Sequence, residues 1–253
     1  SERCPMPPRT SKLAKYGPIV ACLFSTLASA QAPSTPDLLG IYPGMSEQAA
    51  RTQLQKHSST VQIQTLPGAQ MGFWLNASEG RNPEQITVHV TAPPNNPTVW
   101  LVERQQTFER QNPMSQQALL SALRDKYGQE TLSQPKGGWL YLFWIFDAHG
   151  KLLRTANAAL TVCVGSEYIS YNAVGLPPRN LTEKENTCYK NFFGVTAMLN
   201  RSGGDLLESY DVQLTNLPYA YQAAVNVTNA RNAASNHEAK EQLDRGNQNR
   251  PTF

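Results

Sequence analysis

The chain has 253 residues, 40% of them hydrophobic and 16% charged, with a formal net charge of +3. This is the composition of an ordinary soluble protein, and the length suffices for one large domain or two small ones. Beyond residue 30 the chain carries 18 basic and 18 acidic residues. That balance excludes the basic footprint of a nucleic-acid binder, so no nucleic-acid partner is expected.

The first 30 residues have the pattern of a secretory signal. Two lysines precede the apolar run "YGPIVACLFSTLA", and the small residues "ASAQA" follow it. We expect a signal peptide over residues 1–30, cleaved between Ala30 and Gln31, and a periplasmic or secreted protein. The run is too short for a bilayer span, which needs about 20 residues, so no transmembrane span is expected in the mature chain. The lipobox-like "IVAC" would instead lipidate Cys22, but most of the apolar run would then follow the cleavage point.

Cysteines predict a disulfide. Cys4 and Cys22 leave with the signal, and only Cys163 and Cys188 remain. In an exported chain two such cysteines are expected to pair, which would stabilise the fold by about 3 kcal/mol in the chain-entropy model. A reactive or metal-binding thiol would require a nearby histidine or a CxxC spacing, and the sequence has neither.

A first α+β module is predicted over residues 38–111. The stretch 31–37, "QAPSTPD", is expected to be an extended linker. The following "MSEQAARTQL" predicts a helix that Ser46 caps. Strands are expected at 61–65, 71–75, 86–90 and 98–108, with "APPNNP" as the turn before the last.

A second α+β module is predicted over residues 112–218. Its helix begins in "MSQQALLSAL", is capped by Ser115 and ends at Gly128. Strands are expected at 139–146, 159–164, 167–171, 192–199 and 207–214, with a hairpin loop at 200–205. Residues 219–253 are predicted to form a polar C-terminal helix and a tail.

The two modules repeat short segments in the same order. "MSEQA" returns as "MSQQA" after 69 residues, "GFWLN" as "LFWIF" after 70, and "TVHV" as "TVCV" after 74. This indicates duplication. The expected fold class is α+β: two tandem related modules, each a helix followed by antiparallel strands, with the helices packed on one face of the sheet.

Catalytic signatures are absent from the sequence. It has no GxSxG, HExxH, GxxxxGK[ST] or CxxC pattern, so no catalytic or metal-binding residue and no cofactor is predicted. Glu183 and Glu185 are spaced as in a solvated loop. His89 lies in a predicted strand, and the matching position in the second copy of the repeat is Cys163. This favours a structural role for His89. The remaining histidines are expected at the surface: His57, His149 and His237.

The run "WLYLFWIF", residues 139–146, is the best candidate for a binding surface. In a strand Trp139, Tyr141 and Phe143 share one face. An apolar run on both faces is typical of a covered central strand. The alternative is that this face is an exposed aromatic platform for a protein or a sugar.

The opening "GMSEQA", residues 44–49, resembles the Gly-Met-Ser/Thr helix start of the bacterial envelope modules of the SmpA/OmlA type. The tandem arrangement is similar in outline to the two-module β-lactamase inhibitory proteins. This resemblance implies a periplasmic location and action by protein contact without catalysis. The first hypothesis is therefore an exported, non-enzymatic binding or scaffolding protein of the bacterial envelope. The alternative is a periplasmic or secreted hydrolase with acid and base residues on loops, and a third is an oligomeric structural protein, favoured if the strand at 139–146 is an exposed edge.

Overall fold

A computed structural model describes residues 35–58, 60–67, 72–78, 84–109, 111–155, 163 and 183–248. All of them belong to one compact unit, Pro33–Phe253. The predicted signal peptide, its cleavage point between Ala30 and Gln31, and Cys22 lie outside the described residues. The same holds for the strands predicted at 159–164, apart from Cys163, and at 167–171.

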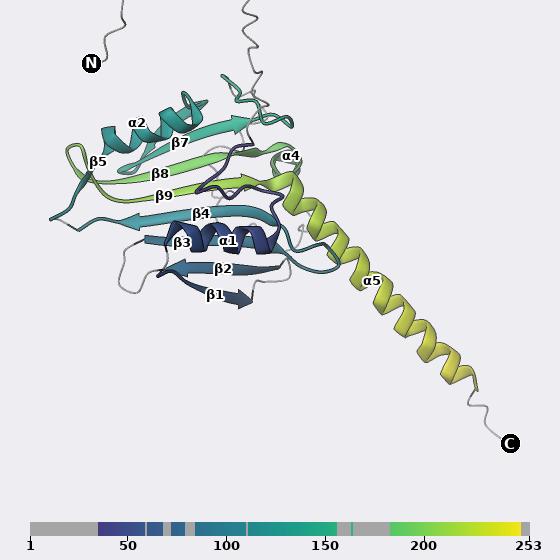
Figure 1. The fold of residues 1–253 in the computed structure, drawn as a ribbon. Helices are drawn as coiled ribbons and strands as arrows, with labels where there is room; N and C mark the ends of the chain where they lie inside the picture. Colours follow the sequence, from purple (N-terminus) through teal and green to yellow (C-terminus); the bar gives the residue numbers. More distant parts are fainter. Residues whose placement is uncertain are drawn as a thin grey trace, which may run out of the picture. The chain divides into compact units, whose positions relative to one another are not determined.

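A single antiparallel sheet organises the unit (Figure 1). Its strands within the described residues are β1 (Gln62–Pro67), β2 (Gly72–Ser78), β3 (Glu84–Thr91), β4 (Val99–Thr107), β5 (Met114–Ser115), β6 (Leu132–Lys136), β7 (Trp139–Phe146), β8 (Phe193–Gly203) and β9 (Leu206–Asn216). The strand order is β1-β2-β3-β4-β9-β8-β7-β6, and the short β5 pairs with β9. The protein is therefore α+β with a large antiparallel sheet, as the sequence predicts at that level.

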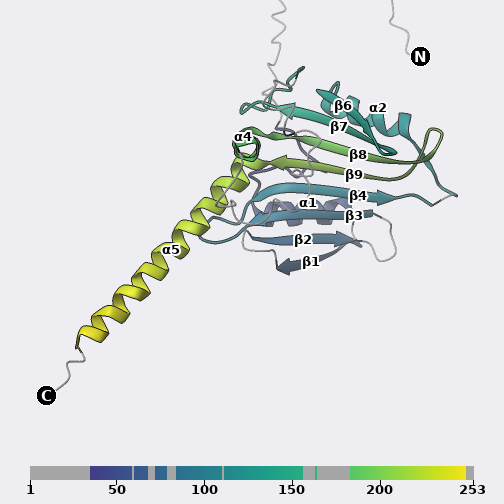
Figure 2. The same cartoon turned by 180° about the vertical axis from the view of Figure 1, so that it is seen from behind.

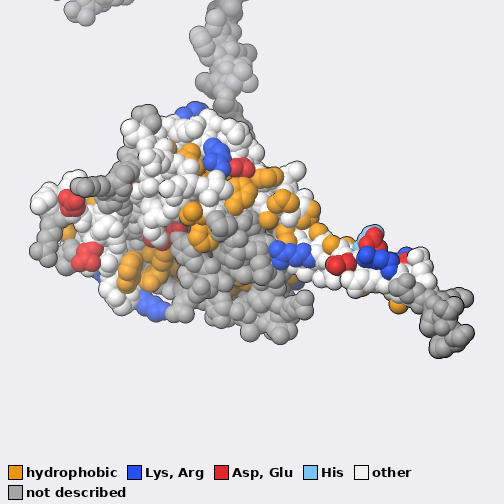
Figure 3. Space-filling model, turned by 90° about the horizontal axis from the view of Figure 1, so that it is seen from below, with side chains coloured by type: hydrophobic (Ala, Val, Ile, Leu, Met, Phe, Trp, Pro, Cys, Tyr) orange, Lys and Arg blue, Asp and Glu red, His pale blue; other side chains and the backbone are white. Residues whose placement is uncertain are grey.

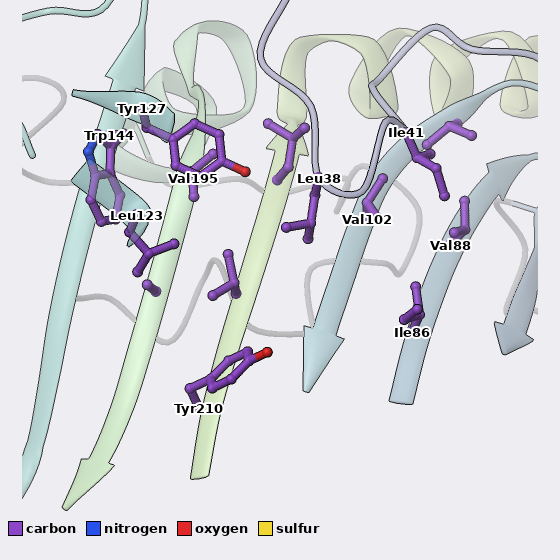
Figure 4. Packing of buried hydrophobic residues seen from close by; sticks show 14 of the residues in the cluster. Leu38, Ile41, Ile86, Val88, Val102, Leu123, Tyr127, Trp144, Val195 and Tyr210 are labelled. Carbon is purple, nitrogen blue, oxygen red and sulfur yellow. The ribbon is translucent and has the colours of Figure 1, made fainter. Parts of the chain in front are cut away.

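Two helices, α1 (Glu47–His57) and α2 (Gln116–Tyr127), pack on the same face of this sheet, which we call the helix face. They lie in front of the strands in Figure 1 and behind them in Figure 2. Ala50 and Leu54 of α1 and Leu123 of α2 enter one continuous core with alternate residues of the strands. Figure 4 shows that core, with Leu123 and Tyr127 over Trp144 and Val195. The helix face is thus a conventional apolar core.

Both predicted N-caps are confirmed. The hydroxyl of Ser46 accepts a hydrogen bond from the backbone N–H of Ala49 at 3.3 Å, and that of Ser115 accepts one from Ala118 at 3.1 Å. Each bond satisfies one of the amide groups that the first turn of a helix leaves without a partner. Gly128 ends α2 with φ +84°, a conformation that glycine adopts without strain.

Two side-chain hydrogen bonds, one from an indole and one from a phenol group, hold the C-terminal end of α2 in place. The Nε1 of Trp144 donates to the carbonyl of Gly128 at 2.8 Å, and the hydroxyl of Tyr127 donates to the carbonyl of Asp37 at 2.6 Å. The carboxylate of Asp37 also accepts a hydrogen bond from Lys126 Nζ at 2.8 Å. The last residue of the predicted linker is therefore tied to the second helix.

Three elements differ from the sequence prediction. β6 was not predicted, because "LSQPK" is polar and contains Pro135, which only an edge strand tolerates. Glu183 and Glu185, predicted to lie in a solvated loop, lie in the helix α4 (Glu183–Asn191). The C-terminal helix α5 (Leu217–Gln248) starts two residues before the predicted 219 and runs for 32 residues.

The repeat correspondences beyond the helices are wrong in detail. Trp74 lies against His89, whereas Trp144 lies in the helix-face core, so the offset of 70 pairs residues from opposite faces. An offset of 69, the same as for the helices, pairs Leu75 with Trp144, both in that core. Cys163 lies in a turn, so it is not a strand counterpart of His89.

Removing the hydroxyl of Ser115 tests the cap of α2. We expect Ser115→Ala to lower the free energy of unfolding by about 1 kcal/mol, because the Ala118 amide loses its acceptor. Ser121 lies exposed in the middle of α2, and Ser121→Ala should leave stability unchanged or slightly raise it. Urea denaturation measures both. Equal losses in the two variants would contradict the assignment.

Candidate functional site

The second face of the sheet, opposite the helix face, is polar at its centre. One cross-strand row on it joins Thr87 of β3, Glu103 of β4, Gln213 of β9 and Thr196 of β8. All four side chains are 7% exposed or less. Burial of polar groups costs free energy unless they are hydrogen-bonded. A buried polar row in the middle of a sheet is therefore unusual.

A pair of carboxyl groups lies at the seam between β4 and β9. Gln105 Nε2 donates to Glu103 Oε1 at 2.9 Å and to Asp211 Oδ2 at 3.2 Å. Gln213 Nε2 donates to the same two oxygens at 3.1 and 3.2 Å. Glu103 and Gln213 are cross-strand partners, and so are Gln105 and Asp211. Two amides therefore bridge two acids in a four-residue square.

The acids of this square share a proton. Burial and the negative charge of Asp211 raise the pKa of Glu103 to about 9. Burial also raises the pKa of Asp211, but hydrogen bonds from Glu103, Gln105 and Gln213 act in the opposite direction. Glu103 therefore holds its proton at neutral pH and donates it in a hydrogen bond to Asp211.

A depression of about 360 Å³ adjoins this square on the second face. Its lining includes Gln105 and Asp211 on one side, Met198, and the aromatic residues Trp139 and Tyr141 on the other. A second cross-strand row explains the arrangement: Tyr141 of β7 pairs with Met198 of β8, which pairs with Asp211 of β9. The depression thus brings an acidic group and an aromatic pair together.

The three predicted binding-surface residues lie in two different environments. Trp139 and Tyr141 are half-buried and line the depression. Phe143 is 1% exposed and packs in a cluster with Cys188 and Phe192. β7 is not an edge strand, because β6 covers it, so the condition set for an oligomeric structural protein is not met.

Cys163 and Cys188 lie at disulfide distance, as the sequence predicts. Their sulfur atoms are 2.11 Å apart and their Cα atoms 5.3 Å apart, and both residues are buried. The pair ties α4 to the chain that follows β7. Such a pair is consistent with an oxidising compartment.

Histidines occupy the environments that the sequence predicts. His89 is 1% exposed and lies between Trp74 and Trp100, with ring centroids 5.1 Å from each. Burial lowers the pKa of His89 to about 4, so the ring is neutral at physiological pH. On the surface, His57 contacts Glu84 at 3.3 Å, while His149 and His237 are exposed.

Metal ligands do not gather in the described part of the chain: no group of three histidine, cysteine, aspartate or glutamate side chains there could hold an ion. Within the same ranges, no helix combines the length and the apolar character needed to cross a bilayer. Comparison with protein families, curated proteins and solved structures finds no match to this chain.

Sequence reasoning missed Glu103 and Asp211. A signal was present, since Glu103 follows "VWLV" and Asp211 precedes "VQL", so each acid interrupts an apolar strand. An acid at an inward position of a central strand needs partners. The pairing of the two could not be foreseen, because it depends on the register between strands 108 residues apart.

Replacing Glu103 tests the shared proton. Because the folded pKa of Glu103 lies near 9 and the unfolded value near 4.5, the unfolded chain releases this proton first. Stability should therefore fall as pH rises from about 5 to about 9, by at most about 1.4 kcal/mol per pH unit. Glu103→Gln mimics the protonated acid and should be more stable than the unmodified protein at pH 8.5, with the difference shrinking at pH 5.

Thermal unfolding at several pH values measures this effect, with the exposed Glu109→Gln as the control. That variant should follow the pH profile of the unmodified chain. If Glu103→Gln loses stability at pH 8.5 more than at pH 5, then Glu103 is ionised in the folded protein and the assignment is incorrect.

Proposed function

We propose that this chain is an exported, non-enzymatic binding or scaffolding protein of the bacterial cell envelope that acts through protein–protein contact. The observation that carries the proposal is the exposed half of α5. The first turns of this helix are anchored, since Leu217, Ala220, Ala223 and Val227 are buried. From Asn229 to Gln248 every residue is exposed, and this part of the helix extends past the sheet in Figures 1 and 2.

An exposed helix of this length has little to hold it in water. In an isolated helix each side-chain pair contributes only a few tenths of a kcal/mol to the stability of the helix. Most helices in proteins are stabilised by packing. The side-chain pairs along this segment include Glu241 with His237 at 3.5 Å and with Arg245 at 3.9 Å, both between exposed groups. Figure 3 shows charged and polar side chains along it with few apolar ones. A partner that packs against it would supply the missing contacts.

Small side chains suit this segment for close approach. Ala230, Ala233 and Ala234 lie within one turn of each other on the exposed part of α5. Alanine at a helix contact allows a partner helix to come closer than larger residues permit. The flanking charges would then determine which partner is accepted.

Register in the sheet supports descent from one duplicated unit. Among the described residues α1 is followed by β1 to β4, and α2 by β6 to β9 with α4 between β7 and β8, and the two sets meet where β4 pairs with β9. Val102 pairs with Leu214 there, and the two occupy equivalent places, since Val88 and Val195 are their respective neighbours. The organisation supports the resemblance to tandem envelope modules, and the cysteine pair supports export.

The hydrolase alternative has one observation in its favour, the carboxyl pair of Glu103 and Asp211. Paired acids with separated pKa values are typical of acid–base sites. However, Glu103 is 2% exposed, so a substrate in the depression meets Asp211 alone. The two acids are also tied together, since Gln105 and Gln213 each donate to both Glu103 Oε1 and Asp211 Oδ2. A buried structural role fits the pair better than catalysis.

A helix-breaking substitution tests the proposal. Ala234→Pro should disrupt the exposed half of α5, at a local cost of about 3 kcal/mol, while leaving the sheet intact. We expect bait carrying this variant to lose a protein that the unmodified chain captures from a bacterial envelope extract. The matched Ala234→Ser bait should retain it. Equal capture by the three baits, or turnover of a substrate that Asp211→Asn abolishes, would favour the alternative.

A further inference from the structure

The depression on the second face adjoins a pair of carboxyl groups that no basic side chain of the described residues balances. Asp211 lines it, and the amides of Gln105 and Gln213 both donate to Oδ2 of Asp211, at 3.2 Å each. Neither acid of the pair forms a salt bridge with any basic group in the described ranges, and no lysine, arginine or histidine is among the lining residues. Arg104, the neighbour of Glu103 in β4, points to the helix face, where its Nε donates to Glu84 Oε1 at 2.5 Å.

The opposite wall is aromatic. Trp139 and Tyr141 are two residues apart in β7, so their rings stand on the same face, and both are half-buried. Neither the indole N–H of Trp139 nor the hydroxyl of Tyr141 donates a hydrogen bond to another described residue. Aromatic faces attract cations, and they do so more strongly where water is partly excluded.

The spacing between the two walls fits one small group. Tyr141 and Asp211 are separated by a single strand, β8, and Met198 lies between them in the cross-strand row. Neighbouring strands are about 4.8 Å apart, which places these walls roughly 10 Å apart at the backbone. A planar guanidinium or a compact ammonium group above the thioether of Met198 would contact both walls.

We propose that this depression is a binding site for an organic cation, a guanidinium or alkylammonium group, held between the carboxylate of Asp211 and the rings of Trp139 and Tyr141. The site is separate from α5. It deepens the proposed function only in one respect, since an arginine or lysine side chain of a protein partner is one source of such a cation. A free amine is the other.

Charge complementarity distinguishes this ligand from a sugar. A neutral sugar ring would use the aromatic wall and the hydrogen-bonding groups, but it would leave the carboxylate of Asp211 in a half-buried place without a counter-charge. A cation satisfies both walls at once.

The test titrates the full chain with N-acetyl-arginine amide at pH 7.5 and follows tryptophan fluorescence. N-acetyl-citrulline amide, the neutral isostere, is the matched probe. We expect saturable binding of the arginine compound and at least roughly tenfold weaker binding of the citrulline compound. Choline and an arginine-containing tripeptide identify the source: stronger binding of the tripeptide indicates a protein ligand, and stronger binding of choline a free amine.

Variants locate the site. Asp211→Asn and Tyr141→Leu should each weaken the arginine compound about tenfold, whereas Tyr42→Leu, at an exposed tyrosine elsewhere, should not. If Asp211→Asn does not fold, Tyr141→Leu and Trp139→Phe carry the test.

Equal binding of the arginine and citrulline compounds would overturn the proposal, and so would tighter binding of methyl glucoside or the absence of any binding. Ala234→Pro should bind the arginine compound like the unmodified chain. Loss of the captured partner in that variant with normal cation binding, or the reverse, separates a failure of this inference from a failure of the proposed function.

Discussion

The ladder between β4 and β9 is the contact on which the remaining structure depends. Residues 101–107 pair with residues 209–215 in an unbroken register, and this is the only place where the sheet halves are hydrogen-bonded through long central strands of the described chain. Because side chains alternate across a sheet, this single register decides two things together. It places Val102 and Leu214 in the apolar core under the helices, and it places Glu103 and Gln213 on the opposite side. A slip of one residue would bury the acids among the core residues and expose the valine.

The two faces of the sheet are therefore stabilised by different kinds of interaction. The helix face is held by apolar contacts and closed by α1 and α2, so its residues are interchangeable with others of similar size. The second face is held at its centre by hydrogen bonds among Glu103, Gln105, Asp211 and Gln213, where each group depends on the next. Polar networks of this kind are sensitive to single changes and restrict the pairing of the strands. Asp211 belongs both to this network and to the lining of the depression.

Much of the fold follows from local patterns, and the candidate site does not. Ser46 and Ser115 cap their helices because capping needs only a hydroxyl three residues before an amide, and the strand at 139–146 has the predicted bounds because its apolar run is uninterrupted. β6 escaped prediction because its pairing with β7, and not its composition, makes it a strand. The acid pair escaped for the same kind of reason, since Glu103 and Asp211 meet only after the distant strands align. The sequence identifies Trp139 and Tyr141 as candidate binding residues. It could not show that Phe143 is buried, because this depends on the cluster with Cys188 and Phe192 that packs against that part of β7.

β9 passes directly into α5, since Asn216 ends the strand and Leu217 begins the helix, where its N–H donates to the carbonyl of Phe192 at 3.0 Å. No loop lies between them to absorb movement. The exposed part of α5 is about 30 Å long at 1.5 Å per residue, which makes it a lever arm fixed to the strand that carries Asp211 and Gln213. A force on the far end of α5 would therefore pass directly to β9, the strand that pairs with β4.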